Sequence, residues 1–131
     1  MTKPVIDHIG IVVGDLNSAV ERLKPLFGDA ITYKELSEEE LKIAKFETQN
    51  ITIELLQYSG SANFAREVMG EKNGLNHVTV RVDDVSKSLS RLEKQNFRPK
   101  DGFPRKGADG EIAFFERDEE TGLLVEICGT D

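Results

Sequence analysis

The sequence predicts an α+β fold made of two βαβββ repeats, which form a curved, cup-shaped mixed sheet with helices on its outer face. The first observation is that the segments IDHIGIVVGDL and LNHVTVRVDDV share one pattern when His8 is aligned with His77. The second is that a helical pattern follows each segment, NSAVERL and SKSLSRL. The third is that ITIELL resembles LLVEIC, which pairs Glu54 with Glu126. Because the two offsets, 69 and 72 residues, are nearly equal, we interpret the chain as two copies of one unit.

Length, net charge, apolar segments and cysteine content limit the classes of protein to which the chain can belong. A length of 131 residues fits a single domain over 1–131, with repeat one at about 4–58, a linking helix at about 61–71 and repeat two at about 74–129. A net charge of −7 without a basic run argues against a nucleic-acid partner. No segment has the apolar length that spans a bilayer, which argues against a membrane protein. The single cysteine, Cys128, excludes an internal disulfide and suits a cytoplasmic protein.

The elements of the first repeat follow from local patterns. Alternating apolar residues predict a strand near 5–13, and helical spacing predicts a helix near 16–25. Asp15 is expected to cap the start of this helix, and Pro25 and Gly28 to end it. Three strands are then expected, near 30–36, 41–47 and 51–57.

The linking segment and the second repeat are read in the same way. SANFAREVMGEKNG predicts a short helix with Ser61 or Asn63 as its cap and Gly70 as its stop. A strand near 76–82 precedes Asp84, which is expected to cap a helix near 85–95. The last strands are expected near 98–101, 111–116 and 123–128. Between the first two of these strands, DGFPRKGADG (101–110) predicts a turn-rich loop that forms a mobile edge over a site.

Strand periodicity separates two faces, because side chains alternate along a strand. One face is apolar throughout and should pack under the helices; it carries Ile9, Ile11, Val13, Ile53, Leu55, Val78, Val80, Val82, Val125 and Ile127. The opposite face is mixed, and it carries His8 and Glu54 from the first repeat and their counterparts His77 and Glu126 from the second. A carboxylate in the middle of such a strand is costly to bury unless another group compensates it.

A divalent metal ion would remove this cost. Two imidazoles and two carboxylates make a mixed N/O donor set that is close to neutral once the ion is bound. We therefore predict one ion, Co, Mn, Ni or Zn, with the ligands His8, Glu54, His77 and Glu126. The alternative is that each histidine is an ordinary core or surface residue and that each glutamate faces water. The presence of both residue types on one face of both repeats favours the metal site.

With these residues named, the chain resembles the vicinal oxygen chelate superfamily, which includes glyoxalase I, the methylmalonyl-CoA epimerases, extradiol dioxygenases and bleomycin-resistance proteins. It is most similar to the methylmalonyl-CoA epimerases. The motifs are DHIGIVVGDL, IELLQ, GLNHVTVRVDDV and GADGEIAFFERDEETGLLVEIC, and they cover nearly the whole chain. Carried over by position, the metal ligands of the family fall on the same four residues. The resemblance implies a homodimer that acts on an acyl-CoA or a thiol conjugate.

The resemblance also implies roles for single residues. In the superfamily a metal ion stabilises the charge that develops when a carbon acid α to a carbonyl loses a proton. Glu126 is our candidate for both ligand and base. Some epimerases carry a second acid/base on the third strand, where this chain has Ile43. The second donor would then be Glu54, Glu47 or a water molecule. Two places also depart from the usual epimerase motifs: Asn76 stands where a second histidine is common, and Glu116-Arg117 stands where His-Pro is usual.

Cations on the inner face and at its rim are candidates for binding the substrate. Lys45 would hold a substrate carboxylate, and Arg81 lies on the same face as His77. Four cations lie in or beside the loop and could bind CoA phosphates, although an ordinary solvated loop explains them equally well: Arg98, Lys100, Arg105 and Lys106.

Two further functions stay open. One is a glyoxalase I-like lyase that isomerises a hemithioacetal, in which a single mobile glutamate serves both faces of the substrate. The other is a metal-free resistance protein that binds a drug. The acidic balance would suit a cationic drug, but such a protein is expected to have lost the metal ligands, and here all four are present.

Overall fold

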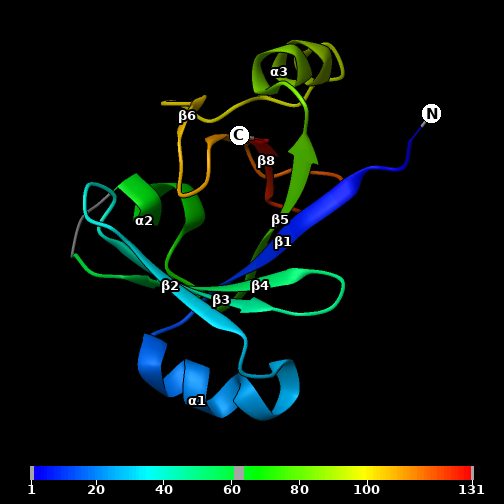
Figure 1. Ribbon diagram of the computed structural model, residues 1–131. Coiled ribbons are helices and arrows are strands. Elements are labelled where there is room, and N and C mark those ends of the chain that lie inside the picture. Colours follow the sequence, from blue (N-terminus) through cyan, green and yellow to red (C-terminus); the bar gives the residue numbers. More distant parts are fainter. Residues whose placement is uncertain (1, 61–63, 131) are drawn as a thin grey trace. The chain divides into compact units, whose positions relative to one another are not determined.

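The computed structural model describes residues 2–60 and 64–130 (Figure 1). Its contacts divide the chain into two compact units, one from His8 to Asn76 and one made of Met1–Asp7 with His77–Asp131. The two units correspond closely to the two predicted repeats, and the single domain over 1–131 stays a prediction. Within the described ranges, every helix is too short or too polar to cross a bilayer.

The unit His8–Asn76 contains the first βαβββ repeat, as predicted. The elements are β1 (Val5–Val12), whose first three residues are assigned to the other unit, α1 (Leu16–Phe27), β2 (Ile31–Leu36), β3 (Leu41–Glu47), β4 (Thr52–Tyr58) and α2 (Phe64–Met69). The strand order is β2-β3-β4-β1, and β1 runs parallel to β4 while the other two pairs are antiparallel. The first strand of the repeat, β1, therefore lies next to the last one, β4. Their register determines which side chains of the two strands are neighbours.

The ends of α1 show two confirmed predictions and one wrong one. The Asp15 side chain accepts a hydrogen bond from the Ser18 backbone N–H at 2.9 Å, so it caps the helix as expected. Pro25, however, lies inside the helix, which continues to Phe27. A proline this close to the end removes only one backbone hydrogen bond, so the last turn survives. Gly28 ends the helix with a φ of 87°, a conformation that glycine adopts without strain.

The second unit contains the second repeat. The elements are β5 (Gly74–Val82), whose first three residues are assigned to the unit His8–Asn76, α3 (Val85–Glu93), β6 (Arg105–Lys106), β7 (Glu111–Phe114) and β8 (Val125–Gly129). The strand order is β5-β8-β7-β6, with β5 parallel to β8 and the other pairs antiparallel. Asp84 caps α3 by accepting from the Lys87 backbone N–H at 3.0 Å. The parallel pair β5 and β8 thus repeats the arrangement of β1 and β4.

Three expectations about loops and links change. The strand expected at 98–101 is reduced to a single bridge between Pro99 and Phe115, because a turn at Asp101 and Gly102 follows it directly. The loop 101–110 contains the short strand β6. The linking helix ends at Met69 and does not extend to residue 71, and its proposed caps Ser61 and Asn63 lie outside the described residues. Gly70 follows this helix with a φ of 82°, and its N–H donates to the Arg66 carbonyl, as its predicted role as a stop requires.

The predicted apolar face packs against the helices in each unit. In the first, Ile9, Ile11, Val13, Ile53 and Leu55 join a core with Leu16 and Val20 of α1 and with Phe46 of β3. In the second, Val80, Val82, Val125 and Ile127 join Val85 and Leu89 of α3. Removing the fully buried ring of Phe46 would cost about 3–5 kcal/mol. This packing leaves the opposite face of each sheet for chemistry.

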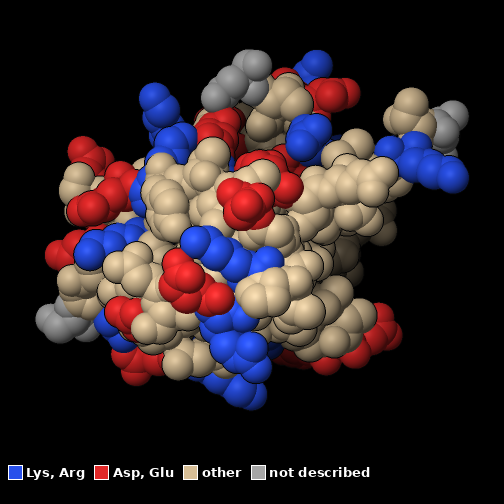
Figure 2. All heavy atoms as spheres, turned by 60° about the horizontal axis from the view of Figure 1, so that its bottom comes forward, with Lys and Arg blue, Asp and Glu red and all other residues tan. Residues whose placement is uncertain are grey.

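The surface drawn in Figure 2 carries acidic and basic side chains interspersed among uncharged ones. This matches the mixed charge of the sequence, in which 24 acidic residues accompany 17 basic ones.

Candidate metal centre

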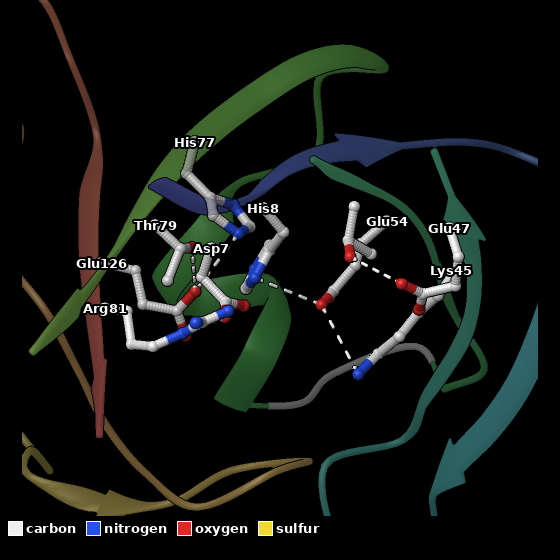
Figure 3. Close-up of polar contacts among 10 residues, drawn as sticks. Asp7, His8, Lys45, Glu47, Glu54, His77, Thr79, Arg81 and Glu126 are labelled. Atoms are coloured by element: carbon white, nitrogen blue, oxygen red, sulfur yellow. Dashed lines mark hydrogen bonds and ion pairs between the residues drawn. The ribbon is translucent and has the colours of Figure 1, made fainter. Parts of the chain in front are cut away.

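The first histidine–glutamate pair lies on the parallel strands β1 and β4. His8 and Glu54 are both only 7% exposed. The His8 Nδ1 atom is 3.3 Å from Glu54 Oε2 (Figure 3). The register explains this contact, because Gly10 is the partner of Glu54 and His8 lies two residues earlier on the same face of β1. The sequence prediction that this pair shares a face is therefore confirmed.

A lysine accompanies the first pair. Lys45 is the partner of Glu54 across the antiparallel pair β3 and β4, and its Nζ atom is 3.8 Å from Glu54 Oε2. Its side chain is 14% exposed, so a mostly buried cation lies beside a buried carboxylate. Ile43, two residues earlier on β3, is 2% exposed. Glu47, at the end of β3, is exposed and accepts a hydrogen bond from the Thr52 hydroxyl at 3.0 Å.

The second pair lies on the parallel strands β5 and β8. His77 is 7% exposed and Glu126 is 5% exposed. The His77 Nε2 atom is 3.5 Å from Glu126 Oε1. Both repeats therefore place a buried imidazole nitrogen within 3.5 Å of a buried carboxylate oxygen.

Thr79 is a residue to which the sequence reasoning gave no role. It is fully buried, and its hydroxyl donates a hydrogen bond to Glu126 Oε1 at 2.5 Å (Figure 3). The signal lay in the register, because Thr79 is the direct partner of Glu126 in the β5–β8 pair. That pairing joins residues 47 positions apart, so a single strand does not reveal it.

Aromatic side chains border the second pair. The Phe114 ring lies edge-on to His77 at 5.0 Å, and Phe114 is also the partner of Glu126 across β7 and β8. Phe103, from the loop 101–110, packs on Phe114 at 5.7 Å between ring centroids. These rings place an apolar border beside the second carboxylate, a feature that strengthens electrostatic interactions there.

The remaining predicted binding residues lie in different places. Arg81 is exposed and donates two hydrogen bonds to Asp7 Oδ1, at 2.7 and 3.0 Å. These bonds, and then the charge of Asp7, raise the pKa of the Arg81 guanidinium above its usual value. Arg105 and Lys106 form β6, which is separated from β8 by β7 in the strand order. Lys45 thus contacts a predicted ligand, Arg81 contacts Asp7, and the two β6 residues lie two strands from Glu126.

Comparisons with known proteins give the family. The family model for the glyoxalase/bleomycin resistance protein/dioxygenase superfamily matches residues 7–115. The uncharacterised protein YqjC of Bacillus subtilis is 32% identical over 126 residues, which cover 94% of this chain and 90% of that protein. The mitochondrial methylmalonyl-CoA epimerase of Dictyostelium discoideum is 27% identical, over 93% of this chain and 76% of that protein.

Solved structures give the same fold. A hypothetical protein of Bacillus halodurans superposes with a TM-score of 0.87 at 21% identity, over 99% of this chain and 96% of that one. The methylmalonyl-CoA epimerase of Mycobacterium tuberculosis superposes with a TM-score of 0.83 at 20% identity, over 100% of this chain and 93% of that one. The predicted fold class, α+β with the vicinal oxygen chelate fold, is therefore confirmed. The chain belongs to the glyoxalase/bleomycin resistance protein/dioxygenase superfamily.

Proposed function

We propose that the chain is a metal-dependent isomerase that abstracts a proton α to a carbonyl, and that its substrate resembles that of methylmalonyl-CoA epimerase. The observation that carries this proposal is that each repeat holds a buried histidine beside a buried glutamate. Methylmalonyl-CoA epimerases are among the relatives and the solved structures, and one of those structures is a complex with methylmalonyl-CoA and NH4+ (TM-score 0.81, 22% identity, over 98% of this chain and 96% of that one).

The donor set fits a divalent ion. His8 and Glu54 from one repeat and His77 and Glu126 from the other would be the ligands. Burial of a carboxylate is costly unless a positive charge compensates it. Lys45 compensates part of the charge of Glu54, and a divalent ion would compensate the remaining negative charge of the two carboxylates. When bound, the ion supplies Lewis acidity that favours negative charge on the substrate carbonyl oxygen. Imidazole and carboxylate donors together suit Co, Mn, Ni or Zn.

The other roles fall to the protein's own side chains. Glu126 would accept the α proton, with the Phe114 ring beside it limiting the access of water. Epimerisation also needs a proton on the opposite face, and Glu54, Glu47 or a water molecule would deliver it. Lys45 would hold the carboxylate of the substrate. Arg81, and at the rim Arg105 and Lys106, would bind the acyl-CoA or thiol carrier.

One observation favours a second candidate function, a glyoxalase I-like lyase. Ile43 is buried where some epimerases carry their second acid/base. A lyase can move a proton between adjacent carbons on one mobile carboxylate, so it does not need that second group. In either reaction the four ligands keep their roles, and a cytoplasmic homodimer stays a prediction.

Solvent exchange tests the proposal directly. The protein, loaded with Co²⁺, Mn²⁺, Ni²⁺ or Zn²⁺, is incubated with methylmalonyl-CoA in D2O, and NMR follows deuterium entering the α position. We expect exchange at least about 100-fold faster than in a Glu126→Gln variant, the range for loss of a general base.

Two results would contradict the proposal in different ways. Exchange no faster than in the Glu126→Gln variant, with turnover of a hemithioacetal, would assign the lyase reaction. A protein that binds none of the four ions would exclude both enzymes.

A further inference from the structure

The two glutamates of the candidate centre have different neighbours on the strand beside them. Aligning His8 with His77 aligns Gly10 with Thr79. Gly10 is the partner of Glu54 in the β1–β4 register, and Thr79 is the partner of Glu126 in the β5–β8 register. Equivalent positions thus hold no side chain in the first repeat and a buried hydroxyl in the second.

We propose that Thr79 is a positioning residue that holds the Glu126 carboxylate in the orientation needed for ion binding and proton abstraction. The inference rests on the proposed function, because it assigns Glu126 the role of ligand and proton acceptor. Thr79 itself touches neither ion nor substrate in this assignment, and it acts through Glu126.

The geometry of the hydrogen bond supports this role. The Thr79 hydroxyl has one proton, and it donates that proton to Glu126 Oε1 at 2.5 Å. A hydroxyl–carboxylate bond of this length lies in the range of strong, charge-assisted hydrogen bonds. The terminal torsion of glutamate is otherwise broad, so this bond restricts a rotation that packing alone leaves loose.

The Thr79 side chain can hold the Glu126 carboxylate in place because it has little conformational freedom of its own. Its side chain is fully buried, and branching at Cβ limits its own χ1 rotation. A buried hydroxyl without a partner is costly, so Thr79 and Glu126 stabilise each other's placement. On the other side of β8, the Phe114 ring is an apolar neighbour. Of the two cross-strand neighbours of Glu126, Thr79 is therefore the one that can donate a hydrogen bond.

The test uses Thr79→Val, which keeps the shape and removes the hydroxyl, and Thr79→Ser, which keeps the hydroxyl. Thr121→Val is the matched control, because the Thr121 hydroxyl donates to the Asp118 carboxylate at 2.6 Å on an exposed turn. Co²⁺ affinity and the Co²⁺ absorption spectrum are measured, together with kcat and KM for α-proton exchange. We expect Thr79→Val to weaken Co²⁺ binding and lower kcat by roughly 10- to 100-fold, the range for residues that orient metal ligands.

The remaining outcomes separate the inference from the proposed function. We expect Thr79→Ser to restore most of the loss, and Thr121→Val to behave like the wild type. Wild-type Co²⁺ affinity, spectrum and kcat in Thr79→Val would overturn the inference and leave the proposed function intact. A wild-type protein that binds no Co²⁺, Mn²⁺, Ni²⁺ or Zn²⁺ would overturn both. If Thr79→Val does not fold, as judged by circular dichroism, Thr79→Ala replaces it with the same expected and contrary results.

Discussion

The two repeats contain the same pair of side chains in different surroundings. In the first repeat, Glu54 lies between His8, at 3.3 Å, and the ammonium group of Lys45, at 3.8 Å. In the second, Glu126 lies between His77, at 3.5 Å, and the hydroxyl of Thr79, at 2.5 Å. The backbone arrangement is common to both, since each glutamate lies on the strand parallel to that of its histidine.

Under the proposed function, this difference would let a duplicated unit perform two tasks. The contact between histidine and glutamate depends on the parallel strand pair, which both repeats contain. Both repeats would therefore supply ligands. The third partner depends on one neighbouring residue, which can change without disturbing the fold. A cation beside Glu54 suits a place where a negatively charged substrate group is bound. A hydroxyl beside Glu126 suits a carboxylate that must keep one orientation.

The largest effects are expected where the two repeats are equivalent. His8→Ala and His77→Ala each remove one imidazole donor, so each should weaken Co²⁺ binding by more than about 100-fold, beyond the loss for an outer partner. Equilibrium dialysis against Co²⁺ measures this, and circular dichroism shows whether each variant is folded. A folded variant that binds Co²⁺ as well as the wild type would remove that histidine from the ligand set.

The sequence predicted which side chains share a face in the two histidine–glutamate pairs, for a physical reason. Strand periodicity assigns each side chain to one of two faces, and the apolar set Ile9, Ile11, Val13 was long enough to define the buried side. The opposite face then followed, with both histidines and both glutamates on it. The α+β class and most element bounds followed from the same alternation and from the helix caps.

The parts that differ between repeats were harder to predict. The Thr79–Glu126 bond joins β5 to β8, and the Arg81–Asp7 pair joins residues 74 positions apart. Both depend on the register between strands, which periodicity within one strand does not fix. The strand expected at 98–101 is only a bridge for a local reason, because the turn at Asp101 and Gly102 follows Lys100 directly.

An effect of intermediate size is expected at Lys45. Lys45→Met should raise KM for methylmalonyl-CoA by roughly tenfold, as expected for loss of one charged hydrogen bond, with a smaller change in kcat. Lys42→Met is the control, because Lys42 lies on the same strand but is exposed and three residues away. Exchange on propionyl-CoA, which lacks the carboxylate, should be nearly unaffected by Lys45→Met. Equal losses on both substrates would mean that Lys45 acts on Glu54 and not on the substrate carboxylate.

The smallest effects are expected at the residues that precede the two histidines, which are again equivalent in the alignment. Asp7 accepts from Arg81, whose side chain is 45% exposed, so water and salt screen this pair. Asn76 donates its side-chain N–H to the Met69 carbonyl at 2.8 Å in a half-buried position.

Asp7→Asn should therefore lower the free energy of unfolding by less than about 1 kcal/mol, a loss that high salt reduces further. Asn76→Ala should cost about 1 kcal/mol at any ionic strength, because it leaves a backbone carbonyl without that donor. Urea unfolding at low and high NaCl measures both values. A loss of unfolding free energy that is larger for Asp7→Asn than for Asn76→Ala, and independent of salt, would contradict this. It would mean that the Asp7–Arg81 pair stabilises the folded structure of its unit as a buried ion pair does. A smaller loss for Asp7→Asn than for Asn76→Ala, in contrast, means that Arg81 depends little on Asp7. Arg81 could then release Asp7 and bind a negatively charged group of the substrate, as its proposed role requires.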